Sequence, residues 1–473
     1  MSTVATPQGF DCLSLRDGLL ARLAAMDFQH MTPIQQAALP AILAGQDVIA
    51  KASTGSGKTV AFALGCLQRL DSKAYHVQSL LLCPTRELAE QVASTLRDLA
   101  KGLANTKVLS LCGGVSIGPQ VGSLQHSAHL IVGTPGRVLK HLRKGTLHVH
   151  GLDVLVLDEA DRMLDMGFAE EISALLEFLP SPRQNLMFSA TYGTSVQAIA
   201  ERLSPNAVSI DVTQREPAPV IDEYWCAVGE ATDKRGRLDL LLQGIAALGT
   251  EANLVFCNTK AGCIELANFF AAQGVPAAVL HGDLEQADRQ QMLIRFSNGS
   301  ARILVATDVA ARGLDIDSAG AVFNADLPQR ADVYTHRIGR TGRSGRAGLA
   351  LSLVGDREMH RLRLIEEARA GVAMQLWQPS SPSPEALALL QPEYQTIEIN
   401  GGRRHKLRPG DILGALTAGK RLPGSAVGNI HILDQISYVA VLREKVSVAI
   451  KQLDRGRIKA RPFRARLVGA EHR

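Results

Sequence analysis

The chain has 473 residues, of which 46% are hydrophobic and 21% are charged, and its formal net charge is +5. This composition is typical of a folded globular protein and excludes a wholly disordered chain. At roughly 150 residues a domain, the length predicts about three folding units. The first residues lack the features of a signal peptide and no run of about eighteen apolar residues occurs, so we expect a cytoplasmic protein that does not cross a membrane.

Continuous apolar runs mark the expected strands of the first 350 or so residues. Five of these runs span residues 80–83, 154–157, 186–188, 254–257 and 303–305. A continuous apolar run is typical of a parallel strand that is buried on both faces. Polar residues follow each run at once, and ligands of open α/β sheets bind outside the carboxyl ends of the strands. We therefore predict two α/β halves, each with a polar functional edge.

A glycine-rich loop precedes these runs. It consists of Ala52, Ser53, Thr54, Gly55, Ser56, Gly57, Lys58 and Thr59. Glycines at this spacing let backbone N–H groups approach phosphate oxygens, while the lysine and the last hydroxyl reach the outer phosphates and magnesium. The loop therefore predicts a site for a nucleoside triphosphate and its metal ion.

An acidic segment ends the strand expected at 154–157, about a hundred residues after the phosphate loop. Its residues are Asp158, Glu159, Ala160 and Asp161. One carboxylate at such a strand end holds the metal, and a second orients or deprotonates the attacking water. The order and spacing of the two segments predict an enzyme that hydrolyses a nucleotide.

Two proline-containing stretches, 211–221 and 378–384, have the composition of semi-extended linkers. Between them, Arg337, Arg340 and Arg343 recur at three-residue spacing. An arginine-rich surface helix would account for that spacing by itself. A role at phosphate is favoured only by the motifs that surround the three arginines.

From roughly Phe10 to Gly348, the chain resembles the DEAD-box RNA helicases, because nearly every motif of that family is present in order. The phosphate loop has the family's Ala-x-x-Gly-x-Gly-Lys-Thr form, and residues 158–161 spell its Asp-Glu-Ala-Asp motif. Residues 32–35 resemble the Q motif that reads adenine, although Asp27 stands where the family often has glycine. Alone, the Thr-Pro of that segment would indicate an ordinary helix start.

The resemblance implies ATP and Mg²⁺ as ligands of one nucleotide site. Phe10 would stack on the adenine, Gln35 would pair with its edge, and Asp315 would contact the ribose. Thr59 and Asp158 would hold Mg²⁺, with a water molecule between Asp158 and the ion. Residues that would couple this site to the other motifs are Asp161, Ser189, Thr191 and Arg343.

The resemblance also assigns the hydrolysis itself. Lys58 would contact the outer phosphates and Glu159 would act on the attacking water. Arg337 and Arg340 would be arginine fingers that reach the γ-phosphate, and such fingers raise rates by on the order of 10³ to 10⁵.

An RNA groove that reads the backbone rather than the sequence is implied as well. Helix starts, glycine turns and hydroxyls suit phosphate oxygens. The implied contacts of the first half are Pro84, Thr85, Arg86, Gly113, Gly114, Thr134, Pro135, Gly136 and Arg137. Those of the second half are Asn258, Thr259, Gln286, Arg289 and Thr307. Because both halves would contact ATP and RNA, each ligand should strengthen binding of the other, and we expect local opening of duplexes.

Beyond residue 384 the pattern changes. Strands expected at 394–400, 430–433, 438–442 and 458–468, with helices from 409 and at 445–453, give the βαββαβ order of an RNA-recognition-type fold. The usual aromatic string of that fold is missing, so we do not expect bases to stack on the sheet. Residues 391–473 contain 16 Lys and Arg against 7 Asp and Glu, whereas the rest of the chain contains 35 against 39. This basic tail suits a polyanion, although a basic solubilising face would share the composition.

Through residues 411–416 and 428–430, the tail is similar to the C-terminal domain of DbpA-type bacterial helicases. This resemblance implies a hairpin of 23S ribosomal RNA as the partner and a role in large-subunit assembly. Several relatives carry such a tail for other RNAs or for proteins, so the target stays open. The expected tail contacts are Arg403, Arg404, Lys406, Arg455, Arg457, Lys459 and Arg461.

Together these features predict an α/β chain of two tandem RecA-like parallel-sheet domains followed by a small RRM-like α+β domain. The expected boundaries are 1–210 and 222–376 for the helicase domains, 211–221 and 377–391 for the linkers, and 392–473 for the RNA-binding domain. An ATP-binding RNA clamp that seldom hydrolyses is disfavoured by Glu159, Arg337 and Arg340. A DNA helicase is the weaker alternative, because an RNA groove can require 2′-hydroxyls. No obligate protein partner is inferred.

Overall fold

The computed structural model describes residues 8–53, 55–213, 220–229, 234–311, 319–342, 347–369, 372–420 and 422–469. The chain falls into two compact units, residues 1–218 with 313–315, and residues 219–312 with 316–473. Among the described residues, no helix combines the length and the apolar character that crossing a membrane requires.

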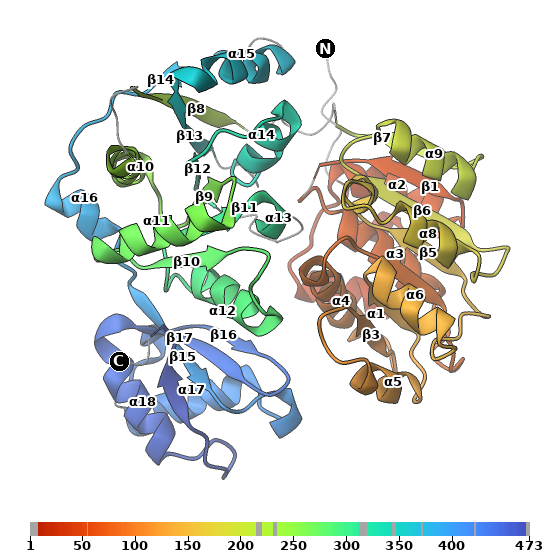
Figure 1. The fold of residues 1–473 in the computed structure, drawn as a ribbon. Helices are drawn as coiled ribbons and strands as arrows, with labels where there is room; N and C mark the ends of the chain where they lie inside the picture. Colours follow the sequence, from red (N-terminus) through yellow and green to blue (C-terminus); the bar gives the residue numbers. More distant parts are fainter. Residues whose placement is uncertain are drawn as a thin grey trace. The chain divides into compact units, whose positions relative to one another are not determined.

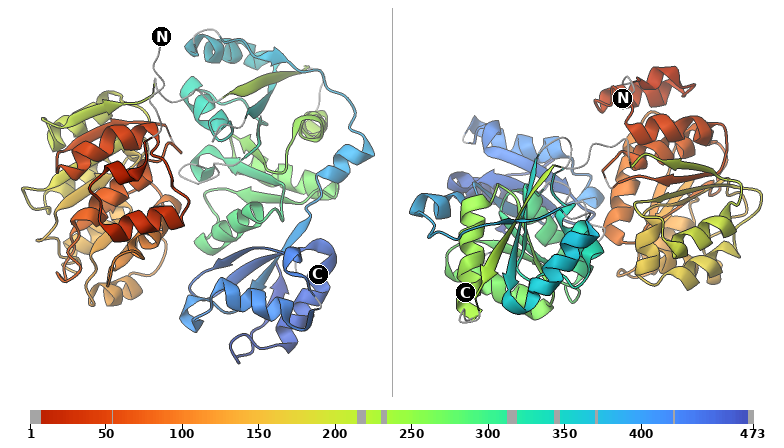
Figure 2. Two further views of the ribbon diagram at one scale, coloured as in Figure 1. Left: turned by 180° about the vertical axis from the view of Figure 1, so that it is seen from behind. Right: turned by 90° about the horizontal axis from the view of Figure 1, so that it is seen from above.

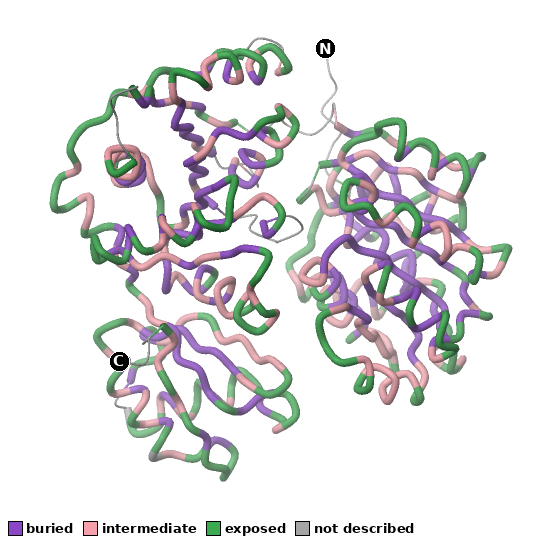
Figure 3. Tube along the Cα trace, viewed as in Figure 1, coloured by how far each residue is buried: buried purple, intermediate pink, exposed green. Residues whose placement is uncertain are grey.

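A seven-stranded parallel sheet in the order β3-β4-β2-β5-β6-β1-β7 forms the centre of the first unit. Its strands are β1 (Val48–Lys51), β2 (Ser79–Leu82), β3 (Val108–Leu111), β4 (Leu130–Gly133), β5 (Val154–Leu157), β6 (Gln184–Ser189) and β7 (Val208–Asp211). The apolar runs expected as strands fall on β2, β5 and β6, which are buried along their whole length (Figure 3). The predicted parallel sheet is confirmed in this unit.

Helices cover both faces of this sheet because successive strand residues point to opposite sides. Val154 and Val156 of β5 join an apolar cluster with α1 to α4, whereas Leu155 and Leu157 join a second cluster with α6 to α9. Figures 1 and 2 show the ribbon of this sheet with helices beside it. The helices are α1 (Asp17–Ala25), α2 (Pro33–Leu43), α3 (Lys58–Arg69), α4 (Arg86–Ala100), α5 (Gly118–Leu124), α6 (Pro135–Arg143), α7 (Ala160–Asp165), α8 (Ala169–Leu176) and α9 (Thr194–Leu203).

The second unit repeats this design with a parallel sheet in the order β10-β11-β9-β12-β13-β8-β14. Its strands are β8 (Ile221–Val228), β9 (Asn253–Cys257), β10 (Ala277–Leu280), β11 (Ile303–Thr307), β12 (Ala321–Asn324), β13 (Gly348–Gly355) and β14 (Gln375–Leu376). Its helices are α10 (Lys234–Leu248), α11 (Lys260–Ala272), α12 (Gln286–Ser297), α13 (Asp308–Ala311), α14 (Ala331–Ile338), α15 (Met359–Ala368) and α16 (Pro384–Leu389). The runs expected at 254–257 and 303–305 lie on β9 and β11.

The same unit also contains the tail, folded as a four-stranded antiparallel sheet in the order β16-β17-β15-β18 with two helices. These elements are β15 (Tyr394–Ile399), α17 (Pro409–Thr417), β16 (Val427–Ile432), β17 (Ser437–Leu442), α18 (Val446–Arg455) and β18 (Ala465–Leu467). The βαββαβ order is confirmed. The last strand is much shorter than the one expected at 458–468, because Ile458 and Arg461 pair with each other in a local turn.

The two faces of the tail sheet differ in character. Ile397 and Ile399 point into the apolar core of the tail, together with residues of α17 and α18. Thr396 and Glu398 point the other way and bond to the segment that begins with α12: Asn298 Nδ2 donates to Thr396 Oγ1 at 3.2 Å, and Gln291 Nε2 donates to Glu398 Oε2 at 3.4 Å. The polar face of the sheet is therefore covered within its own unit.

A close helix contact in the first unit gives a test of packing. An ideal Cβ on Gly102, which follows α4, would overlap the carbonyl oxygen of Gly18 in α1, and the reverse also holds. Since the obstacle is backbone, Gly102→Ala should lower the free energy of unfolding by about 1 to 3 kcal/mol. Urea unfolding of the full chain would measure this loss.

Gly122→Ala is the matched control, because Gly122 lies in α5 with open space around its would-be Cβ. That substitution should be neutral or stabilise by up to about 1 kcal/mol, as expected for alanine in a helix. An unchanged unfolding curve for Gly102→Ala would contradict the packing described for α1 and α4.

Candidate nucleotide and RNA sites

The phosphate loop joins the end of β1 to the start of α3. Gly55 and Gly57 adopt left-handed backbone angles with φ of 83° and 97°, which glycine allows at little cost. Ser56 Oγ donates to the Ser53 carbonyl at 2.8 Å and so tightens the turn. The loop thus presents the N-terminus of a twelve-residue helix, where backbone N–H groups suit phosphate. Ala52 and Thr59 are the first and last residues of the loop, and Thr54 lies outside the described residues.

Lys58, the first residue of α3, is buried and its Nζ donates to the Ala52 carbonyl at 3.1 Å. Its ammonium therefore lies over the loop itself, where an outer phosphate would be held. The contact of Lys58 with the outer phosphates of a nucleotide stays a prediction.

Gln35 connects the Q motif to the phosphate loop. Its Oε1 accepts from the Thr32 backbone at 2.9 Å and its Nε2 donates to the Gly57 carbonyl at 3.0 Å. A Cβ at Gly57 would lie only 2.6 Å from that Nε2, so the loop needs glycine at this point. Phe10 is buried in the first apolar cluster. Adenine contacts of Gln35 and Phe10 stay predictions.

Asp27 occupies a left-handed turn with φ of 61°. Glycine suits such a turn, as the family pattern has it, since the conformation costs most residues about 1 to 2 kcal/mol while aspartate tolerates it better. The Asp27 Oδ1 accepts from Gln29 Nε2 at 3.1 Å. The departure from the family pattern at this position therefore leaves the turn intact.

The acidic segment follows β5 and is buried. Desolvation raises the pKa of Asp158 to about 7; the nearby Lys58 lowers it and Glu159 raises it. Asp158 Oδ1 is buried and has no hydrogen-bond partner among the described residues. A buried, unpartnered carboxylate oxygen beside a phosphate loop fits a hard cation such as Mg²⁺.

The predicted coupling residues come together at the ends of β5 and β6. Asp161 Oδ2 accepts from both the backbone N–H and the hydroxyl of Thr191 at 2.8 Å. Ser189 Oγ accepts from the Asp161 backbone at 3.4 Å and donates to the Thr191 carbonyl at 2.6 Å. These bonds tie the acidic segment to the neighbouring strand. Arg343, the fourth predicted coupling residue, lies outside the described residues.

Predicted RNA contacts of the first unit follow β2, β3 and β4, which are neighbours in the sheet. Thr85 Oγ1 caps α4 by accepting from the Leu88 backbone at 3.3 Å, and Pro84 directly precedes it. The guanidinium of Arg86 lies against Gly113 and Gly114, leaving no room for a Cβ at Gly114. The strand order therefore gathers these residues on one edge.

The segment after β4 completes that edge. Thr134 precedes α6, Pro135 is its first residue, and Gly136 has open space around it. Arg137 is held by Gln120 Oε1 at 2.7 Å and the Val115 carbonyl at 2.8 Å. The structure thus brings the predicted set together, while their contact with RNA stays a prediction.

Arg337 has a different environment from the one predicted. It is 1% exposed, and it donates hydrogen bonds to both carboxylate oxygens of Asp308, from Nε to Oδ1 at 2.6 Å and from Nη2 to Oδ2 at 2.7 Å. The remaining N–H groups donate to Asn324 Oδ1, the Asp326 carbonyl and Asn258 Oδ1. A guanidinium has five N–H donors and all five are used here. The prediction of an arginine finger at this position conflicts with the geometry.

Arg340 is also buried, and Asp315 lies outside the described residues. Asn258 combines its bond to Arg337 with an Nδ2 bond to the Leu327 carbonyl at 3.2 Å. These bonds fix its side chain within the second unit, but the residue is exposed, and its contact with RNA stays a prediction. Asp308 was missed by sequence reasoning, because a partner 29 positions from Arg337 leaves no local pattern.

Other predicted RNA residues of this unit lie at helix starts. Thr259 Oγ1 caps α11 by accepting from the Gly262 backbone at 3.1 Å, and Thr307 Oγ1 accepts from Ala310 at 3.4 Å. Gln286 opens α12, and Arg289 Nη2 donates to the Ala310 carbonyl at 2.8 Å. They follow β9, β10 and β11, which are adjacent in the sheet.

In the tail, the predicted contacts cluster on two loops. Lys459 Nζ donates to the Lys406 carbonyl at 2.7 Å and pairs with Asp411 at 2.9 Å, which joins residues 403–406 to residues 457–461. The exposed members of this group, named the basic loops from here on, are Arg403, Arg404, Lys406, Arg457, Lys459 and Arg461. Arg455 ends α18, and its side chain lies outside the described part of the chain.

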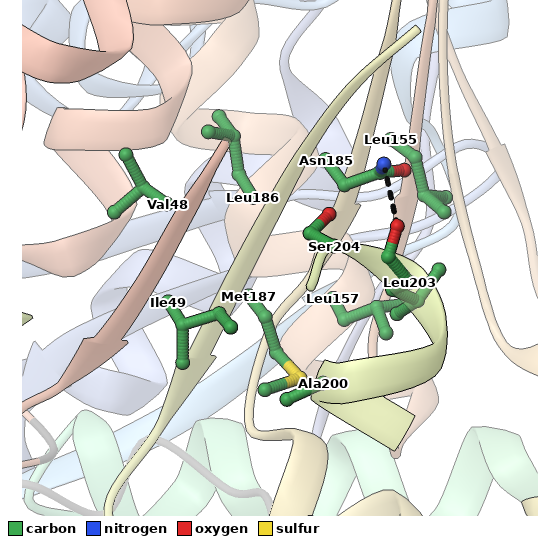
Figure 4. A pocket seen from close by; sticks show the side chains of 10 residues that line it. All are labelled: Val48, Ile49, Leu155, Leu157, Asn185, Leu186, Met187, Ala200, Leu203 and Ser204. Atoms are coloured by element: carbon green, nitrogen blue, oxygen red, sulfur yellow. Dashed lines mark hydrogen bonds between the residues drawn. The ribbon is translucent and has the colours of Figure 1, made fainter. Parts of the chain in front are cut away.

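A small cavity of about 10 Å³ lies in the first unit, lined by residues of β1, β5, β6 and α9 (Figure 4). Apolar side chains such as Leu157 and Met187 form most of its wall. It has room for about one water molecule and lies in the core rather than at the phosphate loop. It is a packing defect rather than a ligand site.

Fold and site together define a class: two parallel α/β sheets, the first with a phosphate loop beside a buried acidic strand end, make a nucleotide-hydrolysing RecA-like helicase core. Family models agree with this assignment along the chain. The DEAD/DEAH box helicase model matches residues 32–199, the helicase conserved C-terminal domain matches 236–345, and the DbpA RNA binding domain matches 396–467.

Individual relatives agree as well. The chain is 46% identical over 449 residues to the ATP-dependent RNA helicase DbpA of Escherichia coli, covering 95% of this chain and 97% of that protein. It is 42% identical over 355 residues to the DEAD-box ATP-dependent RNA helicase CshA of Bacillus cereus, covering 75% and 67%. The structure of Dbp5 of S. cerevisiae bound to RNA and ADP BeF3 matches with a TM-score of 0.70 and 31% identity, covering 81% of this chain and 98% of that one.

The chain therefore belongs to the DEAD-box ATP-dependent RNA helicases of the DbpA type. It binds ATP and RNA and is an RNA-stimulated ATPase.

The clamp on Arg337 generates a stability prediction. Asp308→Ala leaves a buried guanidinium without its carboxylate, which should lower the free energy of unfolding by about 3 to 5 kcal/mol. Asp239→Ala is the control, because its pair with Arg235 in the same unit is exposed, with 45% and 59% of the two side chains accessible. That change should cost less than about 1 kcal/mol. Urea unfolding that fails to separate the two variants would refute the clamp.

Proposed function

We propose that this helicase acts on 23S ribosomal RNA during assembly of the large subunit, and that its tail binds a hairpin of that RNA. The observation that carries the proposal is the match of residues 396–467 to the DbpA RNA binding domain. The basic loops add a physical reason, since exposed arginine and lysine attract phosphate and release counterions.

The rest of the tail narrows the surface available to RNA. Tyr438 and Glu398 lie on the sheet face that an RNA-recognition fold commonly uses for stacking, but both are buried. Tyr438 is 2% exposed, so its ring offers no stacking platform. The basic loops are then the better surface, and a hairpin would be recognised through its shape and backbone.

For hydrolysis, we propose roles that follow from the geometry of the first unit. Lys58 holds the outer phosphates, Glu159 orients or deprotonates the attacking water, and Thr59 and Asp158 hold Mg²⁺. When bound, Mg²⁺ would neutralise the charge that develops on the phosphate oxygens. Gln35, Phe10 and Asp315 are proposed to bind the nucleoside.

The bonds of Arg337 change the role that we assign to this residue in the second unit. Its five bonds make it a structural hub that joins the ends of β9, β11 and β12 to α14. We therefore retain the arginine finger for Arg340 and assign Arg337 to shaping the segment that carries it. Predicted contacts for each ligand are present in both units, so ATP and RNA should reinforce each other's binding. Duplexes would be opened locally. The linkers are proposed at 211–221 and 377–391, and the second range contains the helix α16, whose Leu387 packs against the apolar cluster of the second unit.

The experiment is steady-state ATP hydrolysis by the full chain, titrated with a 23S hairpin fragment, an unrelated RNA and a DNA of the hairpin sequence. We expect the hairpin to stimulate at much lower concentration than the unrelated RNA, and the DNA to stimulate poorly because it lacks 2′-hydroxyls. Equal stimulation by both RNAs would remove the 23S assignment while leaving the helicase. Near-absent hydrolysis with every RNA would favour an ATP-binding clamp.

A charge variant locates the contact on the tail. Arg404→Gln combined with Arg461→Gln should raise the hairpin concentration for half-maximal stimulation by roughly tenfold and reduce the salt dependence of binding by about two counterions. Arg363→Gln, an exposed arginine on α15 outside the tail, is the control for charge alone. A similar effect of both variants would mean that the basic loops have no special role.

A further inference from the structure

Arg162 forms an ion pair with Glu159 inside the acidic segment. Arg162 Nη1 donates to Glu159 Oε2 at 2.7 Å, and the two side chains are 13% and 6% exposed. Glu159 directly precedes α7, and Arg162 is the third residue of that helix. The pair is therefore local, nearly dry, and occupies one of the two carboxylate oxygens.

From this contact we infer that Arg162 is a positioning residue for ATP hydrolysis, acting through Glu159. The inference rests on the proposed role of Glu159 at the attacking water. By holding Oε2, Arg162 restricts the torsions of the glutamate side chain and leaves Oε1 for that water. A reacting group that is displaced by about 1 Å can lose roughly a hundredfold in rate, so such a restraint matters.

The backbone of Glu159 shows why a restraint is needed. Its φ and ψ are both 52°, a left-handed conformation that is uncommon for a long side chain and aims it away from ordinary helical directions. Its first helical bond, from the Met163 N–H to the Glu159 carbonyl at 3.1 Å, fixes the main chain but not the carboxylate. The side chain is held by Arg162 instead.

Other charged side chains near Glu159 bond to different partners. Asp161 is committed to Thr191, and Lys58 donates to the Ala52 carbonyl. Asp158 is adjacent but is itself a carboxyl group, so it cannot supply the opposite charge that would hold the Glu159 carboxylate. Within the described part of the chain, Arg162 is the cation that forms an ion pair with Glu159.

The test compares Arg162→Met, which removes the charge at similar length, with Arg162→Lys, which keeps it. In RNA-stimulated ATP hydrolysis, Arg162→Met should lower kcat by roughly 10- to 100-fold while the KM for ATP changes less than about threefold. Arg162→Lys should recover much of the lost kcat. Binding of labelled RNA in the presence of a non-hydrolysable ATP analogue should remain near that of the unsubstituted protein, because it does not need the attacking water.

A double-variant cycle separates a positioning role from a general structural one. If Arg162 acts through Glu159, then adding Arg162→Met to Glu159→Gln should not lower single-turnover hydrolysis any further. Additive losses, or equal losses of kcat and ATP-dependent RNA binding, would overturn the inference. Faster hydrolysis without RNA in Arg162→Met would also overturn it, since the pair would then be a restraint on activity.

The same series distinguishes failure of the inference from failure of the role given to Glu159. Normal turnover in Glu159→Gln would remove both. An inactive Glu159→Gln beside a normal Arg162→Met would remove only the inference, and would leave Glu159 as the residue that acts on water.

Discussion

The carboxyl ends of parallel strands decide where the chemistry of this helicase lies. In the first unit, β5, β6 and β1 are consecutive in the sheet and lead into the acidic segment, Ser189 and the phosphate loop. On the other side of β5, the neighbours β2, β4 and β3 lead into the predicted RNA contacts. One strand order thus places the candidate nucleotide residues on one half of an edge and the predicted RNA contacts on the other. Asp158 stands at the boundary between them.

Buried charge is the second constraint, since an unpaired charge in a protein interior is costly. In each unit, a buried charged side chain is paired with one of opposite charge from the same unit. Arg162 accompanies Glu159 in the first unit, and Asp308 accompanies Arg337 in the second. Asp158 differs, with a raised pKa and an oxygen that has no hydrogen-bond partner among the described residues. This carboxylate is also the one proposed to hold the metal ion, and that role would account for the cost of burying it.

Much of this architecture could be predicted from the sequence, because continuous apolar runs with polar ends are typical of buried parallel strands and of few other structures. The strands at 154–157 and 254–257 and the order of the tail are examples. Long-range side-chain partners could not be predicted. Arg337 and Arg340 belong to the same three-residue repeat in the sequence. Only the fold shows that the guanidinium of Arg337 is bonded to Asp308.

Side-chain partners and turns that are close in sequence could not be predicted either. Arg162 lies only three residues from Glu159, but helical spacing does not decide which neighbour a buried carboxylate takes. The short β18 reflects left-handed turns at Lys459 and Ala460 that no alternation pattern reveals.

We expect the binding of nucleotide and the binding of RNA to be thermodynamically coupled. The most direct measurement is the affinity of a fluorescent, non-hydrolysable ATP analogue with and without saturating RNA, and the affinity of RNA with and without saturating analogue. Linkage requires the two enhancement factors to be equal, and coupling free energies are typically about 1 to 3 kcal/mol, or roughly 5- to 150-fold. We predict equal factors within that range. A factor of one in both directions would show that the two sets of contacts are independent and would contradict the proposed coupling.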